Sequence, residues 1–168
     1  GLVTLHRPAN VDDPVNLKRI CQVINKIMEK TKLVFPVHPR TRKNLDAFGL
    51  LKELQSNENL YMTDPISYVP FMSLVFNCWF VLTDSGGIQE ETTYLGIPCL
   101  TLRPNTERPI TVTQGTNKLC NLNNVNIYVE NILNKDNQET TVPDLWDGHT
   151  AVRIVEALTK TFHLNIVV

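Results

Sequence analysis

The sequence predicts an α/β fold in which a parallel sheet is covered by helices on both faces. Short apolar runs typical of buried strands alternate along the 168 residues with segments whose apolar residues recur at helical spacing. Strands that are regularly separated by helices connect through right-handed crossovers and form a parallel sheet. Hydrophobic residues make up 42% of the chain, which is enough to bury the core of one domain. We therefore expect residues 1–168 to form a single α/β domain.

Several short segments have the composition of buried strands. They are rich in branched and aromatic residues and are bounded by polar or turn-forming residues. We expect strands over residues 3–6, 33–37, 60–63, 78–82, 97–102 and 118–122. A helical segment separates each of these strands from the next one.

The helical segments have recognisable starts and ends. The segment Asp12-Asp13-Pro14 supplies a cap and a proline suited to a first turn, and the apolar residues that follow, up to Ile27, keep a helical period. Gly49 and Gly96 end two later helices. We expect helices over residues 14–27, 40–48, 68–77, 88–95, 124–133 and 150–163, and one that begins near residue 108. Residues 134–148 are mostly polar and are predicted to be a connector.

Composition and charge exclude several classes of partner. The chain has 16 basic and 17 acidic residues without a basic stripe, so neither nucleic acid nor a membrane surface is an expected partner. No apolar run approaches the roughly 20 residues that span a bilayer, and no secretion signal is present, which predicts a cytoplasmic protein. The cysteines Cys21, Cys78, Cys99 and Cys120 lack paired spacing and are expected to be buried free thiols rather than metal ligands. The start at Gly1, next to a strand-like run, indicates a piece of a longer protein.

The segment Thr83-Asp84-Ser85-Gly86-Gly87-Ile88-Gln89-Glu90-Glu91 predicts a binding site for an anion. Its pattern is that of a strand that ends in a glycine turn and opens directly into a helix, whose first amides lack partners within the helix. A phosphate accepts hydrogen bonds from such amides, and two glycines let it approach the backbone. Glu91 lies on the same helix face as Gly87, about 6 Å along the axis, where its carboxylate would accept hydrogen bonds from a ribose diol. The alternative is that Glu90 and Glu91 only favour the first helical turn through the dipole.

Polar residues also follow other predicted strands, at the carboxyl edge where α/β sheets bind ligands. His6 and Arg7 end the first strand and are suited to a phosphate or a departing diphosphate. Asn10 is expected to hold the following loop by local hydrogen bonds rather than to contact substrate. His38 precedes Pro39 at the end of the second strand and is either a ligand contact or part of a rigid turn.

Two further segments complete this predicted edge. Phe71 follows the third strand and would stack on a flat base, although periodicity alone favours a core position for it. Arg103 and Arg108 bring two guanidinium groups to the edge, where Glu107 is expected to pair with Arg108. The chain has no P-loop, no G-x-G-x-x-G motif and no serine nucleophile elbow, which argues against triphosphate hydrolysis and dinucleotide redox chemistry.

Six motifs occur in a defined order along the chain. They are His6-Arg7-Pro8-Ala9-Asn10, Pro36-Val37-His38-Pro39, Asp64-Pro65, Tyr68-Val69-Pro70-Phe71, the run from Leu82 to Glu91, and Thr106-Glu107-Arg108-Pro109. In this combination the chain closely resembles the carboxyl-terminal half of the non-hydrolysing UDP-N-acetylglucosamine 2-epimerases. The resemblance covers nearly the whole chain. Many members of the family have glutamate where this chain has Ala9, which leaves open the regulation by a second nucleotide sugar that the resemblance links to His38.

The resemblance implies one half of a GT-B-type two-domain fold. This chain would be the Rossmann-like UDP-binding domain, and its partner would be an amino-terminal domain that is not part of this chain. His6 would be the catalytic residue beside the diphosphate. The implied UDP-binding residues are Ile66 and Phe71 for the base, Ser85, Gly86 and Gly87 for the diphosphate, Glu91 for the ribose and Arg108 for the phosphates. Arg7, Asn10 and His38 are secondary candidates.

The resemblance implies an isomerase that needs neither a cofactor nor a metal. UDP is eliminated from UDP-GlcNAc to leave an enol-ether sugar and adds back on the other face to give UDP-ManNAc, a step of cell-envelope polysaccharide biosynthesis. The isolated domain is expected to be inactive, and the full-length protein is compatible with a homodimer. The alternatives are a hydrolysing epimerase, an epimerase of another UDP-2-acetamido sugar, a GT-B glycosyltransferase and a module that only binds UDP-sugars.

Overall fold

Six parallel strands form one sheet in the structure, a computed structural model that describes residues 1–134 and 142–162. Their order across the sheet is β3-β2-β1-β4-β5-β6. The strands are β1 (Leu2–Thr4), β2 (Leu33–Pro36), β3 (Leu60–Thr63), β4 (Val81–Thr83), β5 (Cys99–Leu102) and β6 (Asn117–Cys120). From β1 the chain moves outward through β2 and β3, and it then returns to the other side of β1 as β4. Ligands of such sheets bind at this switch point, beyond the carboxyl ends of the strands.

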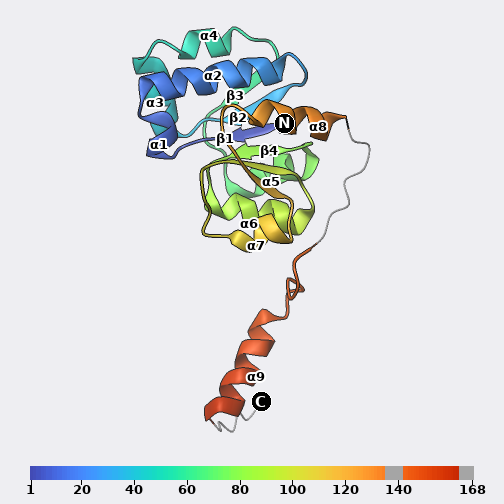
Figure 1. Ribbon diagram of the computed structural model, residues 1–168. Coiled ribbons are helices and arrows are strands. Elements are labelled where there is room, and N and C mark those ends of the chain that lie inside the picture. Colours follow the sequence, from blue (N-terminus) through green and yellow to red (C-terminus); the bar gives the residue numbers. More distant parts are fainter. Residues whose placement is uncertain (135–141, 163–168) are drawn as a thin grey trace.

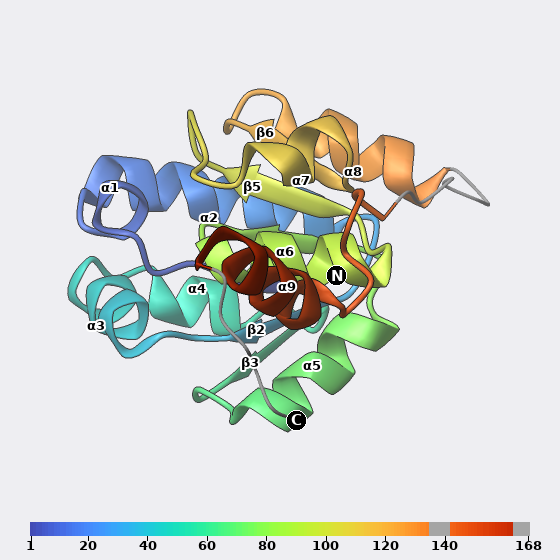
Figure 2. The same ribbon diagram turned by 90° about the horizontal axis from the view of Figure 1, so that it is seen from below.

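Helices cover both faces of this sheet (Figure 1, Figure 2). In the described parts of the chain they are α1 (Pro8–Val11), α2 (Pro14–Met28), α3 (Pro39–Ala47), α4 (Leu51–Gln55), α5 (Tyr68–Asn77), α6 (Gly86–Leu95), α7 (Pro109–Thr113), α8 (Val125–Leu133) and α9 (Thr150–Phe162). Apolar residues of α2, α3, α4 and α8 join one face of the sheet in a large hydrophobic cluster. Residues of α5 and α6 join the other face in a smaller cluster. The predicted α/β class, a Rossmann-like parallel sheet with helices on both faces, is confirmed.

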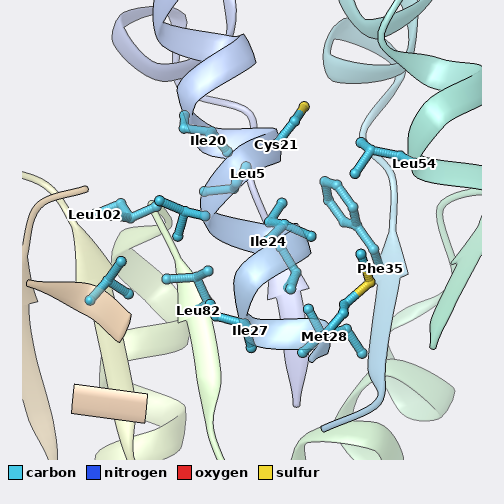
Figure 3. Packing of buried hydrophobic residues seen from close by; sticks show 14 of the residues in the cluster. Leu5, Ile20, Cys21, Ile24, Ile27, Met28, Phe35, Leu54, Leu82 and Leu102 are labelled. Carbon is cyan, nitrogen blue, oxygen red and sulfur yellow. The ribbon is translucent and has the colours of Figure 1, made fainter. Parts of the chain in front are cut away.

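The helix α2 shows how the sequence specifies the larger cluster. The Asp13 carboxylate accepts a hydrogen bond from the Asn16 amide at 2.7 Å and caps the helix. Side chains at helical spacing, among them Ile20, Ile24 and Ile27, are then buried to 1% exposure against the sheet (Figure 3). Burial of each such side chain contributes roughly 1.5–3 kcal/mol relative to leaving it exposed. This packing holds β1 and β4 side by side, and therefore also the loops that follow them.

Most of the predicted elements are present, and the differences have local causes. β4 begins at Val81 rather than at residue 78, because Cys78 ends α5 and the Trp79 side chain is 59% exposed. The sequence does not predict α1 and α4, which have four and five residues, since so short a helix has no period to detect. β1 ends at Thr4, so His6 lies in the loop after the strand rather than in the strand itself.

The helix α9 projects away from the sheet (Figure 1), and seen from below it lies in front of α6 (Figure 2). It has an apolar side that includes Val155, Leu158 and Phe162, yet none of its residues is buried. Its span falls within the helix expected over residues 150–163, of which residue 163 lies outside the described residues. None of the helices within 1–134 and 142–162 has the length and apolar character needed to cross a membrane.

Candidate functional site

The loops after β1 and β4 meet at the switch point of the sheet. The two strands pair in parallel register, so both loops leave the sheet at the same edge. The loop after β1 contains His6 and Arg7, and the loop after β4 contains Asp84 and Ser85. The fold therefore brings together two predicted groups that the sequence separates by 78 residues between His6 and Asp84.

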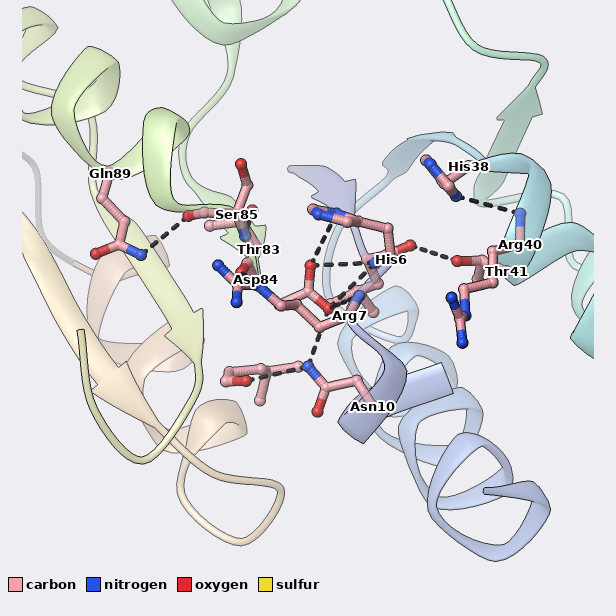
Figure 4. Close-up of polar contacts among 12 residues, drawn as sticks. His6, Arg7, Asn10, His38, Arg40, Thr41, Thr83, Asp84, Ser85 and Gln89 are labelled. Atoms are coloured by element: carbon pink, nitrogen blue, oxygen red, sulfur yellow. Dashed lines mark hydrogen bonds and ion pairs between the residues drawn. The ribbon is translucent and has the colours of Figure 1, made fainter. Parts of the chain in front are cut away.

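Asp84 is at the centre of the polar contacts between these loops and is fully buried (Figure 4). Its carboxylate accepts hydrogen bonds from the backbone amides of His6, at 3.1 Å, and Arg7, at 2.9 Å. It also accepts one from Nδ2 of Asn10 at 3.0 Å, and Nδ1 of His6 lies 3.1 Å from its Oδ1 atom. A buried carboxylate is costly without such donors. The carboxylate of Asp84 thus determines the shape of the loop after β1.

The sequence pattern includes Asp84 within the glycine turn but gives it no role of its own. A signal for its role was nevertheless available. Asp84 directly follows a buried strand, where a carboxylate has no water around it and must find donors in a neighbouring loop. In a parallel sheet the loop after an adjacent strand is the nearest source of such donors. What the sequence alone cannot give is the strand order that makes β1 this neighbour.

Asp84 also sets the hydrogen position on the His6 ring. A hydrogen on Nδ1, directed at the carboxylate, leaves Nε2 as the acceptor of the neutral imidazole. The His6 side chain is 37% exposed, so the ring is accessible to a ligand beyond the strand ends. This arrangement suits a histidine that exchanges a proton at its outer nitrogen.

Arg7 and Asn10 mainly hold the loop. Nε of Arg7 donates to the backbone oxygen of Asp84 at 3.3 Å. Nδ2 of Asn10 donates to Leu102 at the end of β5, at 3.1 Å, in addition to Asp84. Asn10 therefore connects the ends of β1, β4 and β5 through bonds to distant segments, whereas the sequence predicts local hydrogen bonds within its own loop.

His38 lies beside His6 at the same edge. The centroids of the two rings are 5.4 Å apart, and their planes are tilted by 37°. Nδ1 of His38 accepts a hydrogen bond from the Arg40 amide at 3.2 Å and so caps α3. His38 thus has the turn-forming role that was one of its two interpretations, and it also reaches the ring of the catalytic candidate.

The start of α6 is open to an approaching ligand. Ser85 is the N-cap residue, but its side chain makes no capping hydrogen bond, and its amide donates to Thr83 Oγ1 at 3.0 Å. A Cβ atom built on Gly86 or Gly87 would meet no atom within 4 Å, and neither glycine has a positive φ. The fold itself therefore does not require glycine at these two positions. Glycine leaves the first amides of α6 accessible, as the binding of a phosphate requires.

Glu90 and Glu91 contact different neighbours. Oε2 of Glu90 lies 2.9 Å from Nε of Arg108, just before α7. Glu91 interacts with the hydroxyl of Tyr68 at the start of α5, and its charge and hydrogen bond raise the pKa of that phenol. Each glutamate thus has a partner outside α6, so the helix dipole alone does not account for them. Glu91 lies on the side of α5, the helix that contains Phe71.

The two predicted base-binding residues lie around the start of α5. Ile66, in the loop before the helix, and Phe71, within it, are both half-buried. Phe71 packs against the smaller hydrophobic cluster of Leu2, Val75 and Val81. Phe71 therefore belongs partly to the core, as its periodicity indicates, and keeps part of its ring accessible.

The predicted pairing of Glu107 with Arg108 is wrong. Glu107 makes two hydrogen bonds with the Arg103 guanidinium, at 2.6 and 2.9 Å, and these lower the pKa of Glu107 to about 2. Arg108 pairs with Glu90 instead. The cause is geometric: the loop brings Arg103 opposite Glu107, where its planar fork matches both carboxylate oxygens. Arg108 is the last residue of this loop, and its side chain lies against Glu90 of α6.

The described residues contribute no cluster of metal ligands and no activated thiol. No group of three or more histidine, cysteine, aspartate or glutamate side chains that would hold a metal ion occurs among them. Burial raises the pKa of Cys99 to about 11 and that of Cys120 to about 12, so both thiols are protonated near neutral pH. The groups available at the edge are therefore amides, guanidinium groups, carboxylates and imidazoles. This set suits a phosphorylated ligand that also has a diol.

Comparisons with known proteins agree with this chemistry. The family model for UDP-N-acetylglucosamine 2-epimerase matches residues 1–159. The UDP-N-acetylglucosamine 2-epimerase of Methanocaldococcus jannaschii is 42% identical over 162 residues, which are 94% of this chain and 44% of that protein. The UDP-2,3-diacetamido-2,3-dideoxy-D-glucuronate 2-epimerase of Pseudomonas aeruginosa is 42% identical over 119 residues, 70% of this chain and 32% of that protein.

A solved structure shows the same fold. The crystal structure of the Methanocaldococcus jannaschii UDP-GlcNAc 2-epimerase in complex with UDP-GlcNAc and UDP has a TM-score of 0.80 and 42% identity to this chain. The match covers 93% of this chain and 44% of that one. The chain thus spans less than half the length of the relatives that it matches, and its sheet corresponds to one half of their GT-B-type fold.

Proposed function

Because this chain belongs to the UDP-N-acetylglucosamine 2-epimerase family, we propose that it is the UDP-binding domain of an enzyme that interconverts UDP-GlcNAc and UDP-ManNAc. The observation that carries the proposal is the His6–Asp84 pair beside the accessible amides of α6, at the switch point of the sheet. In the proposal, residues 1–168 are the carboxyl-terminal domain. An amino-terminal domain of the full-length protein forms the other wall of the active site.

The diphosphate of the substrate is proposed to bind at the start of α6. Ser85, Gly86 and Gly87 hold it through the first amides of the helix and the favourable end of the helix dipole. The open space in front of both glycines supports this assignment. Arg108 supplies a guanidinium to the phosphates, and its ion pair with Glu90 directs the side chain toward α6.

The uridine is proposed to bind between α6 and α5. Glu91 accepts hydrogen bonds from the ribose hydroxyls, and the hydroxyl of Tyr68 holds its carboxylate. The accessible part of the Phe71 ring stacks on the uracil, and the backbone at Ile66 bonds the edge of the base. The position of Glu91 on the α5 side of α6 supports this order of base, ribose and phosphate along the two helices.

The proposed reaction consists of elimination followed by addition. A base removes the proton at C2 of the sugar, the electron pair of that bond forms the C1–C2 double bond, and the C1–O bond to UDP breaks. UDP leaves with the electron pair of the broken C1–O bond. In the return step UDP adds to C1, and a proton enters C2 on the opposite face. The carboxylate bases belong to the amino-terminal domain in this proposal.

This domain is proposed to stabilise the departing UDP. A protonated His6 donates from Nε2 to a diphosphate oxygen, while Asp84 holds Nδ1 of the ring on the other side. The helix amides and Arg108 meet the negative charge that develops on the leaving group. No step calls for a cofactor. The proposal also includes a cytoplasmic location and a homodimer of the full-length protein, whose mass light scattering would measure.

A second candidate function is epimerisation of a different UDP-2-acetamido sugar. The Pseudomonas aeruginosa relative, a UDP-2,3-diacetamido-2,3-dideoxy-D-glucuronate 2-epimerase, is the observation that supports it. The groups that would contact UDP are the same for both substrates, so this domain does not separate them. Assays of the full-length protein with each UDP-sugar do.

The experiment that tests the proposal has two parts. Calorimetric titration of this chain with UDP should show saturable binding, with much weaker binding of uridine because the diphosphate contacts are missing. The full-length protein incubated with UDP-GlcNAc in deuterated water should incorporate deuterium at C2 and produce UDP-ManNAc. A folded chain that ignores millimolar UDP would contradict the site. Binding of UDP-GlcNAc without exchange at C2 would indicate a module that only binds UDP-sugars, and release of free ManNAc would indicate a hydrolysing enzyme.

A further inference from the structure

Two buried amide side chains connect the glycine turn with the loop before α7. Gln89 in α6 is fully buried, and Asn117 in β6 is 2% exposed. Burial of an amide is unfavourable unless its polar atoms find partners. The two side chains contact each other, because Nδ2 of Asn117 donates to Oε1 of Gln89 at 3.0 Å. They form an amide pair between α6 and the sheet.

Gln89 is the member of this pair that contacts the proposed diphosphate site. Its Nε2 donates to the backbone oxygen of Ser85, the N-cap residue of α6, at 2.9 Å (Figure 4). Its Oε1 accepts from the hydroxyl of Thr106 at 2.6 Å, in addition to Asn117. One side chain thus joins the turn that precedes α6 to the loop that precedes α7.

The same pair determines the backbone of Arg108 through two threonine hydroxyls. The Arg108 amide donates to Thr106 Oγ1 at 3.0 Å, and the Arg108 carbonyl accepts from Thr111 Oγ1 at 2.7 Å. Thr111 Oγ1 in turn accepts from Nδ2 of Asn117 at 3.0 Å. The backbone of Arg108, with φ −124° and ψ 57°, is neither helical nor extended, so it depends on these bonds.

We propose that the Gln89–Asn117 pair positions Arg108 relative to the glycine turn, so that guanidinium and helix amides meet the same diphosphate. The inference rests on the proposed function, because it requires UDP at this edge. Gln89 and Asn117 touch no ligand and act through Ser85, Thr106 and Arg108. Apolar side chains would be enough to fill this part of the core. A polar network in which every group is hydrogen-bonded also fixes one arrangement of the loops that it joins.

The first test replaces Gln89 by methionine, which keeps the length and removes both polar ends. The affinity for UDP should fall by about tenfold, the loss expected when a hydrogen bond to a charged group is misplaced. The affinity for uridine should change by less than about twofold, because Arg108 contacts only phosphates in this scheme. In an Arg108→Met background, Gln89→Met should have little further effect on UDP binding, since the residue through which it acts is gone.

A second pair of variants keeps the test valid if Gln89→Met does not fold. Thr106→Val removes the hydroxyl between Gln89 and the Arg108 amide, and Thr106→Ser retains it. UDP affinity should fall for valine and be restored for serine. Thr93→Val is the matched control, because Thr93 is also buried in α6 and its hydroxyl has no hydrogen-bond partner among the described residues. This control should leave UDP affinity unchanged.

The outcomes separate this inference from the proposed function. Equal UDP affinity in the unmutated chain, Gln89→Met and Thr106→Val would overturn the positioning role alone. Equal losses for UDP and uridine would also overturn it, because they would indicate a general disturbance of the fold. No binding of UDP by the unmutated, folded chain would overturn the site itself and this inference with it.

Discussion

Asp84 has donors on several sides and is completely buried. Two are backbone amides, one is the Asn10 side chain and one is the His6 ring. The backbone amides donate to Asp84 irrespective of which side chains the loop has. The His6 imidazole differs from them because a ligand can also reach it. A single carboxylate therefore serves both the stability of the loop and the state of the proposed catalytic ring.

Substitution of Asp84 by asparagine should separate these two effects. The amide nitrogen of asparagine cannot accept a hydrogen bond, so at least one of the N–H groups that now donate to Asp84 would lose its acceptor. The free energy of unfolding should therefore fall by about 1–3 kcal/mol. In the full-length protein the epimerisation rate should fall, because the His6 ring loses the carboxylate that holds its Nδ1 atom in place. Urea unfolding and the deuterium exchange assay measure the two effects.

Asp64→Asn is the control for this substitution. The side chain of Asp64 is 86% exposed, and its ion pair with Arg42 lies at the surface. Its removal should change the free energy of unfolding by less than about 1 kcal/mol. Equal losses of stability in both variants would contradict the central role of Asp84.

Gly87→Ala should alter ligand binding without harming the fold. The new methyl group meets no atom within 4 Å, and alanine is a better helix former, so stability should stay equal or rise by up to about 1 kcal/mol. If a phosphate sits against this backbone, UDP affinity should fall by about tenfold or more. Gly49→Ala should do the reverse: its φ of 70° disfavours alanine, so stability falls while UDP affinity stays the same. Thermal unfolding and calorimetry together check both variants.

The ion pair between Glu107 and Arg103 leads to a prediction about how stability depends on pH. The pKa of Glu107 is lowered to about 2 from an ordinary value of 4.5, so the ionised form is favoured in the folded chain. Its contribution to stability is therefore present above the unfolded pKa and is lost as the pH falls from 4.5 toward about 2. In Arg103→Met, an NMR titration should find the Glu107 pKa raised toward its ordinary value, because the largest cause of its lowering is gone. Arg108→Met should leave it low, and the opposite pattern would restore the pairing first expected from sequence.

At the scale of one element, α6 has contacts of different kinds along its length. Its first turn presents open amides, and its buried side holds Gln89. Its next residues contact the loop before α7 through Glu90 and the start of α5 through Glu91. The sequence indicates the first of these, because a strand, a glycine pair and a helix follow one another directly. It cannot indicate the partners of the two glutamates, since those come from segments 18 or more residues away.

Glu90 and Glu91 should therefore differ in which ligand they affect. Glu91→Gln should weaken the binding of both uridine and UDP, because the ribose is common to them. Glu90→Gln should weaken only the binding of UDP, through the loss of direction of Arg108. Parallel titrations of the two variants with the two ligands measure this. Equal effects of both substitutions on uridine would show that the assigned helix face is wrong.

For the molecule as a whole, the period of apolar residues predicts the class of fold and most elements. It misses what depends on tertiary packing. Trp79 is apolar and follows Cys78 in an apolar run, yet it is exposed, because the chain is still turning from α5 into β4. The strand order places the Asp84 carboxylate beside His6, and no local pattern contains that order. Local patterns indicate an anion site at the glycine turn, a diol contact at Glu91 and a stacking role for Phe71, and the resemblance to a known family relates these groups to one ligand, UDP.

Removal of the last helix should leave this domain intact. No residue of α9 is buried, so deletion of residues 149–168 should change the free energy of unfolding by less than about 0.5 kcal/mol. The affinity for UDP should also be unchanged, because none of the proposed ligand contacts lies in the deleted part. Urea unfolding of the long and the short chain provides the measurement. A loss of more than about 2 kcal/mol would show that α9 packs on the domain.

The hydrogen bonds to Asp84 join segments that are 74 to 78 residues apart, and this separation has a kinetic consequence. Contacts across so long a stretch form only after the entropy of closing a large loop has been lost, so they belong to the late steps of folding. A ligand that recognises this edge has nothing to bind in the unfolded chain or before β1 and β4 pair. It would therefore slow unfolding while leaving the rate of folding as it was. The bound nucleotide would protect the folded domain against unfolding, and it would not accelerate folding.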